Sequence, residues 1–470
     1  MDWSEGYVTD IGYVRGYYRE LSPLFQSFSL SLAGREPPDL SAPFTKLELG
    51  CGYGLSVLME AAVFPHAQFY GVDFMPEHIA WAKRIAAQAG LENVHFYELS
   101  FVDLMGSAIP DVDFVAMHGV WSWVSAENRQ AILRFLDKRL KSGGVVLNSY
   151  NVLPGWAAQQ GLRELMMRKY RSTSGPSGPR IEEALQFAQS VRTAEAGLFK
   201  TYPQLGEYLD GLMTKPKRYL AHEYFNQDWH LFYQHQVAEM FAGVRMAYAG
   251  SCRPTENLGH LNYTPAALKL ISSVAPGEQE TLKDTFASRM FRYDMYSRGL
   301  EALAIPYGSM MDMTFVLTGD PGRFADGTFK AQVGVVKYKK ELSEPITSRL
   351  LKGPAVAREF MAQPGHRALL PAQIAEILAV LIDTDIVSPA LPVAQAAAVA
   401  ERTKRLNTVL LQRLDKGEES MFLVSPVTGL AHHVQNMEMT FLLAMSKGKE
   451  PVAGVWESLK AQGKKMVREG

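Results

Sequence analysis

Three glycines stand at alternate positions, Gly50, Gly52 and Gly54, directly after a short apolar run that contains Glu48. Glycine lets the backbone adopt conformations closed to other residues, and it lets a ligand approach the main chain closely. The residues that follow Gly54 are good helix formers. The stretch therefore predicts a strand, a tight turn and a helix N-terminus, an arrangement suited to holding a ligand against the backbone.

A carboxylate accompanies this turn. Asp73 ends a second apolar run, 68–73, and lies 19 residues after Gly54. At about that distance, a two-stranded nucleotide unit presents an acid to ribose hydroxyls. The glycine spacing differs from the dinucleotide fingerprint, and a charge on Glu48 would repel a pyrophosphate. The pattern favours a ligand with a ribose and no phosphate, such as S-adenosylmethionine (SAM), over an ordinary turn of an α/β sheet.

Strand and helix patterns alternate from residue 45 to residue 150, which predicts a parallel, doubly wound sheet with ligands at the carboxyl ends of its strands. The residues expected to bind the cofactor are Glu48, Gly50, Cys51, Gly52, Gly54, Asp73, Phe74, Met75, Ser100, Phe101, Asp103 and His118. The residues expected on the catalytic, acceptor side are Tyr150, Asn151, His118, Trp121 and Tyr18. For Ser100 and Asp103, a polar loop without cofactor contact is an equal alternative. For His118, a structural role is an equal alternative.

Proline at the first turn predicts a helix over 76–89. Ser125 is expected to cap a helix that runs to Lys141 and ends at Gly143–Gly144, before a strand over 145–147. Later strands over 244–248 and 290–296 would complete a seven-stranded, Rossmann-like sheet. Beyond residue 299, short strand patterns precede a helical region over 370–414.

The chain of 470 residues is long enough for several domains. We expect an N-terminal tyrosine-rich segment that is either a lid or packing, a SAM-binding core, a helical insertion, a regulatory region that completes the sheet, and an α+β accessory domain resembling a winged helix. These parts are assigned to residues 1–44, 45–170, 171–217, 218–300 and 301–470.

Composition narrows the class of protein. The chain carries 48 Lys and Arg against 49 Asp and Glu, so nucleic acid is not expected as a partner. Its two cysteines, Cys51 and Cys252, cannot form a disulfide framework, and no metal site is expected. Neither a secretory signal nor a long apolar run is visible, which predicts a cytoplasmic protein without a membrane span.

Five blocks of sequence resemble marker blocks of a known family. They are residues 48–54, 118–124, 149–156, 219–226 and 425–429. The family is that of class I SAM-dependent methyltransferases with a methyltransferase regulatory domain, which includes bacterial lysine methyltransferases that modify surface proteins. The resemblance implies SAM as cofactor, S-adenosylhomocysteine as product and protein lysine as acceptor. Trp121 departs from the tyrosine that those lysine methyltransferases usually carry.

Methyl transfer from a sulfonium is an in-line displacement, so the protein mainly has to align the reactants and exclude water. A lysine acceptor must first lose its proton, and burial favours the neutral amine. No dedicated base is demanded by the sequence. The alternatives are a small-molecule or sugar methyltransferase with a dimerising C-terminal domain, a non-catalytic SAM-binding scaffold and, more distantly, a nicotinamide dehydrogenase. A homodimer is a possible assembly.

Overall fold

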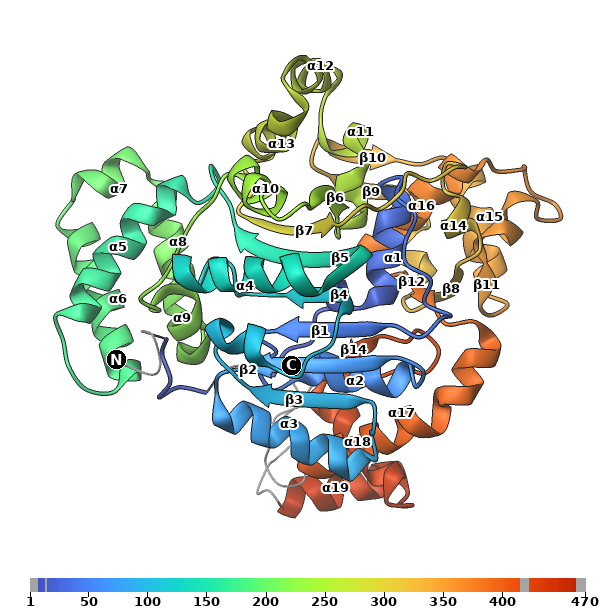
Figure 1. Ribbon diagram of the computed structural model, residues 1–470, viewed down its shortest axis with the longest axis horizontal. Helices are drawn as coiled ribbons and strands as arrows, with labels where there is room; N and C mark the ends of the chain where they lie inside the picture. The colour runs from blue at the N-terminus through green and yellow to red at the C-terminus, as the bar shows by residue number, and fades with distance from the viewer. Residues whose placement is uncertain (1–6, 13–14, 415–421, 462–470) are drawn as a thin grey trace. The chain divides into compact units, whose positions relative to one another are not determined.

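The computed structural model describes residues 7–12, 15–414 and 422–461 (Figure 1). These residues divide into two compact units. We call residues 15–99, 302–328 and 337–461 the glycine-turn unit, and residues 7–12, 100–301 and 329–336 the His118 unit.

A seven-stranded sheet has the strand order β3-β2-β1-β4-β5-β7-β6. β1 to β3 pair in parallel, as do β4 and β5, whereas β7 is antiparallel to both β5 and β6. The predicted seven-stranded α/β sheet is therefore confirmed, with one strand reversed. Its strands are β1 (Thr45–Leu49), β2 (Gln68–Asp73), β3 (Val94–Glu98), β4 (Val112–Met117), β5 (Leu140–Asn151), β6 (Ala247–Ser251) and β7 (Phe291–Ser297).

In the glycine-turn unit, helices α2 (Leu55–Val63) and α3 (Pro76–Ala89) pack against β2 and β3, whereas α1 (Pro23–Leu32) packs against the later strand β12 (Val387–Ala390). α3 has the predicted bounds, with proline in its first turn and Gly90 in a left-handed conformation after its last residue. The long helix α17 (Val393–Leu414) packs against α2 and α3 (Figure 1).

A side chain from α17 holds this packing in place. Arg402 donates hydrogen bonds to the carbonyl oxygen of Ala61 and to Oδ1 of Asn93. The Nδ2 group of Asn93 in turn donates to carbonyl oxygens at the end of α2. The C-terminal part of the chain is therefore bonded directly to the layer that carries the glycine turn.

The rest of the glycine-turn unit mixes helices with small sheets. A three-stranded sheet has the order β11-β8-β12, and β13 pairs with β14. The helical region predicted over 370–414 is interrupted by β12, where the chain pairs with β8. The winged-helix arrangement stays a prediction. The elements are β8 (Thr314–Leu317), α15 (Lys340–Leu350), β11 (Ala355–Val356), α16 (Pro371–Asp383), β12 (Val387–Ala390), β13 (Phe422–Val424), β14 (Ala431–His433), α18 (Asn436–Ser446) and α19 (Pro451–Ala461).

The His118 unit contains two groups of helices. α5, α6, α8 and α9 enclose a hydrophobic core of their own, which the N-terminal residue Val8 joins. α10 and α13 pack together beside β6 and β7, and α12 packs on α13 (Figure 1). The helices are α4 (Ala126–Arg139), α5 (Ala157–Arg171), α6 (Ser177–Thr193), α7 (Gly197–Thr201), α8 (Gln204–Met213), α9 (Lys217–Tyr224), α10 (Gln234–Ala242), α12 (Pro265–Ser273) and α13 (Gln279–Ala287).

The boundary between α4 and β5 differs from the prediction. Ser125 caps α4 as expected, since its hydroxyl accepts from the Asn128 N–H group, but the helix ends at Arg139 and β5 begins at Leu140. Gly143 and Gly144 therefore lie inside the strand. The main chain of Arg298, just after β7, bonds to both glycines and holds this end of β5 extended.

The predicted strand over 244–248 begins three residues later than expected, at Ala247. Arg245 has a left-handed backbone with φ of 64°, and the N–H group of Met246 donates back to the carbonyl oxygen of Phe241. These residues form the turn that ends α10, so the strand starts only after them. The return of the late strands to the sheet, predicted from the sequence, is confirmed.

Candidate active site

The glycine turn after β1 is fixed by main-chain hydrogen bonds. The N–H groups of Gly50 and Cys51 both donate to the carbonyl oxygen of Val72, over 2.8 and 3.0 Å. Gly50, Gly52 and Gly54 have φ values of 68°, 53° and 66°, a region that residues with a Cβ adopt at a cost. The turn has the left-handed geometry for which the three glycines were expected.

Gly54 is also required by packing. A Cβ built on Gly54 would lie 2.4 Å from Cε1 of Phe96, and one on Gly71 would lie 2.7 Å from the same ring. Phe96 comes from β3 and fills the space beneath the start of α2. The sequence carries no signal for this contact, because the contact depends on how closely β3 approaches α2.

The carboxylate of Asp73, 8% exposed, connects the turn to α3. Its Oδ2 accepts from the Gly52 N–H group over 2.8 Å, and its Oδ1 accepts from the Met75 N–H group over 2.9 Å. Nδ1 of His78 lies 3.3 Å from Oδ1. Because each carboxylate oxygen has two lone pairs, Asp73 can order the turn and still accept from hydroxyls of a ligand. Phe74 and Met75 follow it, half-buried.

An aromatic cluster that the sequence reading did not single out lies beside the turn. The ring of Tyr53 contacts Trp81 and His78, and its hydroxyl lies 3.4 Å from a carboxylate oxygen of Glu77. The Arg15 guanidinium lies 4.6 Å from the centre of the Tyr53 ring and 5.1 Å from that of Trp81. The N-terminal segment thus contacts the aromatic cluster beside the turn through the guanidinium of Arg15.

The tyrosines of the N-terminal segment have different surroundings. Tyr17 is buried, with its ring centre 6.0 Å from that of Phe422. Tyr18 is half-buried and precedes the short 3-10 helix Arg19–Leu21. Tyr13 lies outside the described residues. A catalytic role for Tyr18 stays a prediction.

Glu48 belongs to a buried group of three charges. The Lys46 ammonium pairs with Glu60 and lies 3.9 Å from Oε2 of Glu48. Burial raises the pKa of Glu48 to about 8 and that of Glu60 to about 7, although Lys46 acts in the opposite direction on both. One ammonium cannot neutralise two buried carboxylates, so a proton is shared among them near neutral pH. The full negative charge that the sequence argument assigned to Glu48 is therefore reduced.

In the His118 unit, His118 follows β4 and is held from two sides. Its Nδ1 lies 3.0 Å from the Ser149 hydroxyl, which accepts from the Gly119 N–H group. Its ring stacks on Tyr293 with centres 5.4 Å apart, and the Arg253 guanidinium lies over Tyr293. Burial and the Arg253 charge lower the pKa of His118 to about 3. The imidazole is therefore neutral near pH 7, with its Nδ1 hydrogen-bonded to the Ser149 hydroxyl.

Tyr150 is almost fully buried, and its hydroxyl donates to Oδ2 of Asp294 over 2.6 Å. Arg292 joins Asp294 to two further carboxylates, Asp284 and Glu280, in one ionic network. Burial, together with the Asp294 charge, raises the pKa of Tyr150. The hydroxyl thus serves first as a partner of Asp294.

Trp121 and Asn151 are also enclosed. Trp121 is 0% exposed, and its ring centre lies 5.2 Å from that of Phe241. Asn151 is 3% exposed, and its N–H group donates to the Ser122 hydroxyl over 2.9 Å. Roles of Tyr150, Asn151 and Trp121 at an acceptor stay predictions.

The residues predicted at the adenine edge lie at the start of a short 3-10 helix, Phe101–Gly106. The Ser100 hydroxyl donates to Oδ2 of Asp103 over 2.6 Å. Asp103 is exposed and Phe101 half-buried. The loop is therefore ordered by its own polar pair, and cofactor contacts from it stay predictions.

The described ranges contain neither a membrane-spanning helix nor a cluster of metal ligands. None of the helices there combines the length and hydropathy that a membrane span requires. No three His, Cys, Asp or Glu side chains gather there as a metal ion would need.

Comparisons with known proteins bear on both units. A family model described as a methyltransferase domain matches residues 47–146, and one described as a predicted methyltransferase regulatory domain matches residues 216–298. The uncharacterized protein sll1526 of Synechocystis is 33% identical over 474 residues, covering 100% of this chain and 93% of the relative. The uncharacterized protein RP028 of Rickettsia prowazekii is 31% identical over 224 residues, covering 47% of this chain and 85% of the relative.

A solved structure has the same fold along nearly the whole chain. PKMT2 from Rickettsia typhi, in complex with AdoHcy, superposes with a TM-score of 0.69 at 20% identity. The superposition covers 97% of this chain and 93% of PKMT2.

Proposed function

Because the chain belongs to the family of SAM-dependent methyltransferases that carry a methyltransferase regulatory domain, we propose that it methylates the side-chain amine of lysine in a protein. The observation that carries the donor assignment is the bond from the Gly52 N–H group to Asp73. The acceptor assignment is supported by the sequence blocks that resemble bacterial lysine methyltransferases and by the likeness in fold to PKMT2 along nearly the whole chain.

In this proposal Gly50, Gly52 and Gly54 let the main chain meet the methionine and ribose parts of SAM. Asp73 accepts from the ribose hydroxyls with the lone pairs that Gly52 and Met75 leave available. Half-buried Phe74 packs against the adenine. The turn glycines and Asp73 are already ordered by hydrogen bonds, so little reorganisation of these groups accompanies binding.

The transfer itself forms one N–C bond and breaks one C–S bond. The neutral amine attacks the methyl carbon, the sulfonium becomes the thioether of S-adenosylhomocysteine, and the lysine proton leaves to solvent before attack. His118 is a poor proton acceptor at neutral pH, because its pKa is lowered and Nδ1 is bonded to Ser149. We assign to His118 and Asn151 the positioning of the acceptor, and to Tyr150 the support of that strand end through Asp294.

The test is transfer of labelled methyl from SAM to a protein fraction, followed by hydrolysis and identification of methyllysine. We expect labelled methyllysine with the unaltered protein. Asp73→Ala should lose SAM binding by calorimetry and all transfer, whereas Asp111→Ala, an exposed carboxylate paired with Arg139, should behave like the unaltered protein. Label only in a small-molecule extract would replace protein lysine by a small acceptor, and SAM binding without any transfer would indicate a scaffold.

A further inference from the structure

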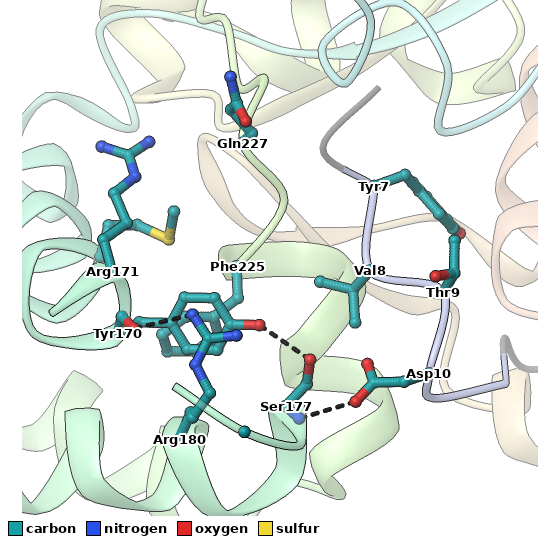
Figure 2. Close-up of a pocket in the computed structure, with 12 residues that line it drawn as sticks. Tyr7, Val8, Thr9, Asp10, Tyr170, Arg171, Ser177, Arg180, Phe225 and Gln227 are labelled. Atoms are coloured by element: carbon teal, nitrogen blue, oxygen red, sulfur yellow. Dashed lines mark hydrogen bonds between the residues drawn. The ribbon is translucent and has the colours of Figure 1, made fainter. Parts of the chain in front are cut away.

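An open groove of about 460 Å³ lies in the His118 unit, between residues 7–10 and the facing ends of α5 and α6 (Figure 2). Tyr7, Val8, Thr9 and Asp10 form one wall. The opposite wall contains two arginines, Arg171 at the end of α5 and Arg180 in the first turns of α6, as Figure 2 shows. Neither arginine has a place in the methyl transfer described above.

The N-terminal wall is firmly attached to the helices. The Val8 N–H group donates to Oδ1 of Asn226 over 3.1 Å. The Asp10 carboxylate accepts from the Ser177 N–H group over 2.8 Å, at the start of α6. Nε2 of His222 lies 3.0 Å from the carbonyl oxygen of Ile11. Three separate hydrogen bonds therefore attach the N-terminal residues to the start of α6, to α9 and to the loop after α9.

The two guanidinium groups differ in how they are held. Arg180 lies 3.7 Å from the centre of the Tyr170 ring and donates from Nη2 to the Tyr170 carbonyl oxygen over 2.9 Å. Arg171 is exposed and makes no hydrogen bond or ion pair within the described ranges. One cation is thus preorganised and the other is adaptable.

The groove carries net positive charge. Among the described residues that line the groove, Asp10 is the single carboxylate, and it is already bonded to Ser177. Burial is the largest single influence on the pKa of Asp10 and raises it, but the Ser177 hydrogen bonds, with a smaller effect of the Arg180 charge, together lower the pKa, so Asp10 is ionised. Two guanidinium groups and one engaged carboxylate therefore line the groove. Guanidinium groups favour carboxylates and other planar anions, which they bind with paired N–H groups.

We propose that this groove binds an acidic segment of the protein acceptor, with its carboxylates against Arg171 and Arg180. An open groove suits a length of chain better than an isolated anion. Tyr7, Thr9 and Gln227 add polar groups along it for hydrogen bonds to the segment. The identity of the partner as the methyl acceptor rests on the proposed function; the preference for acidic peptide does not.

The length of α5 sets the spacing in the acceptor. α5 has 15 residues and begins six residues after β5 ends at Asn151, so its far end lies about 20 Å from its start. An extended chain advances about 3.3 Å per residue. Taking the lysine to be held near the start of α5, as the positioning role proposed for Asn151 implies, we expect the acidic residues roughly six or seven positions from it.

The first test measures binding alone. A fluorescent hexaglutamate peptide, capped at both ends, is titrated with the protein at low salt and followed by anisotropy. We expect Arg171→Gln to weaken binding about fivefold or more, as for loss of one partly exposed charged hydrogen bond. The matched control is Arg168→Gln, which removes a charge from the same helix at a side chain that is 78% exposed and pairs with Glu164.

Equal weakening in the two variants, or no binding of the peptide to the unaltered protein, would overturn the proposal. Inorganic phosphate at constant ionic strength forms a further arm. We expect it to leave the peptide bound; complete displacement by millimolar phosphate would make the groove a site for small anions and would also overturn the acidic-segment assignment.

The second test measures transfer to peptides that contain one lysine. A peptide with three glutamates centred seven residues from the lysine should have a KM at least fivefold lower than one with glutamines there, and Arg171→Gln should remove that difference without changing kcat. Equal KM values for the two peptides would reject the spacing. Absence of transfer to every peptide, with selective binding retained, would count against the proposed function and leave the groove assignment standing.

Discussion

The glycine-turn unit and the His118 unit assemble their candidate site residues in different ways. In the first, a turn of five residues is bonded to a carboxylate 21 residues away from Gly52. In the second, Tyr150 is bonded to a carboxylate 144 residues away, and His118 to a hydroxyl 31 residues away. A binding motif made by residues close in the sequence can be recognised from that sequence alone. A site made by distant residues forms only when the sheet is complete, so the sequence does not reveal it.

The two units also differ in the charge that they bury. The glycine-turn unit encloses more carboxylates than cations around Lys46, and burial raises the pKa of Glu48 and of Glu60. The His118 unit encloses a histidine whose pKa burial lowers. The first arrangement retains protons that an unfolded chain would release, and the second excludes a proton that an unfolded chain would bind. The two groups therefore change the stability of the protein in opposite directions as pH rises.

The largest effect is expected from Gly54→Ala, which should destabilise the protein by about 3 kcal/mol or more and abolish SAM binding. A left-handed backbone costs ~1–2 kcal/mol for alanine, and forcing a methyl group against a packed ring costs ~1–3 kcal/mol. Both apply here, because φ is 66° and the added Cβ would meet Phe96 at 2.4 Å. Urea unfolding and calorimetric titration with SAM give the two measurements.

Gly90→Ala is the matched control for that substitution. Gly90 has φ of 65° and nothing within 4 Å of an added Cβ, so only the backbone cost of ~1–2 kcal/mol remains and SAM binding should persist. If the two variants lost the same stability, Phe96 would not be the reason for a glycine at position 54.

Much of the glycine-turn unit could be predicted from the sequence, because its signals are local. Proline at position 76 and glycine at position 90 mark the bounds of α3, and the turn glycines indicate the backbone that the structure shows. The packing of Phe96 against Gly54 could not be predicted, since it depends on how closely β3 approaches α2.

The His118 unit could be predicted less well, for a physical reason. Tyr150 and Asn151 were expected at the end of β5, and they are there, but their alternation across the sheet directs the Tyr150 hydroxyl toward Asp294 of β7. The start of β5 at Leu140 was missed because Arg298, 158 residues later, holds it extended. Pairing with an antiparallel strand from a distant region leaves no mark in the sequence of β5 itself.

A smaller effect is expected from Glu48→Gln, and it depends on pH. The folded-state pKa of about 8 lies above the ordinary value of 4.5, so ionisation of Glu48 opposes folding and the free energy of unfolding falls as pH rises through this range. From pH 6 to pH 8, the free energy of unfolding of the unaltered protein should fall by about 2 kcal/mol more than that of the variant. Parallel stability curves for the two proteins, measured by urea unfolding, would show that Glu48 does not hold the proton.

The smallest effect is expected from His118→Gln, and its sign is opposite. The folded-state pKa of about 3 lies below the ordinary value of 6.5, so the unfolded chain binds a proton that the folded protein excludes, and stability falls as pH drops below 6.5. From pH 7 to pH 5, the free energy of unfolding would fall by about 2 kcal/mol for a fully buried ring. The partial exposure of His118 reduces the expected fall to about 1 kcal/mol.

Glutamine at position 118 should remove that loss, whereas His95→Gln, near the outer edge of β3, should retain it. The same comparison separates a structural from a chemical role. Because His118 is neutral, kcat should depend on pH in the same way in the unaltered protein and in His118→Gln between pH 5 and pH 8. An inflection that disappears in His118→Gln would mean that the imidazole takes up a proton during transfer, and the His118 unit would then supply a general base and not only position the acceptor.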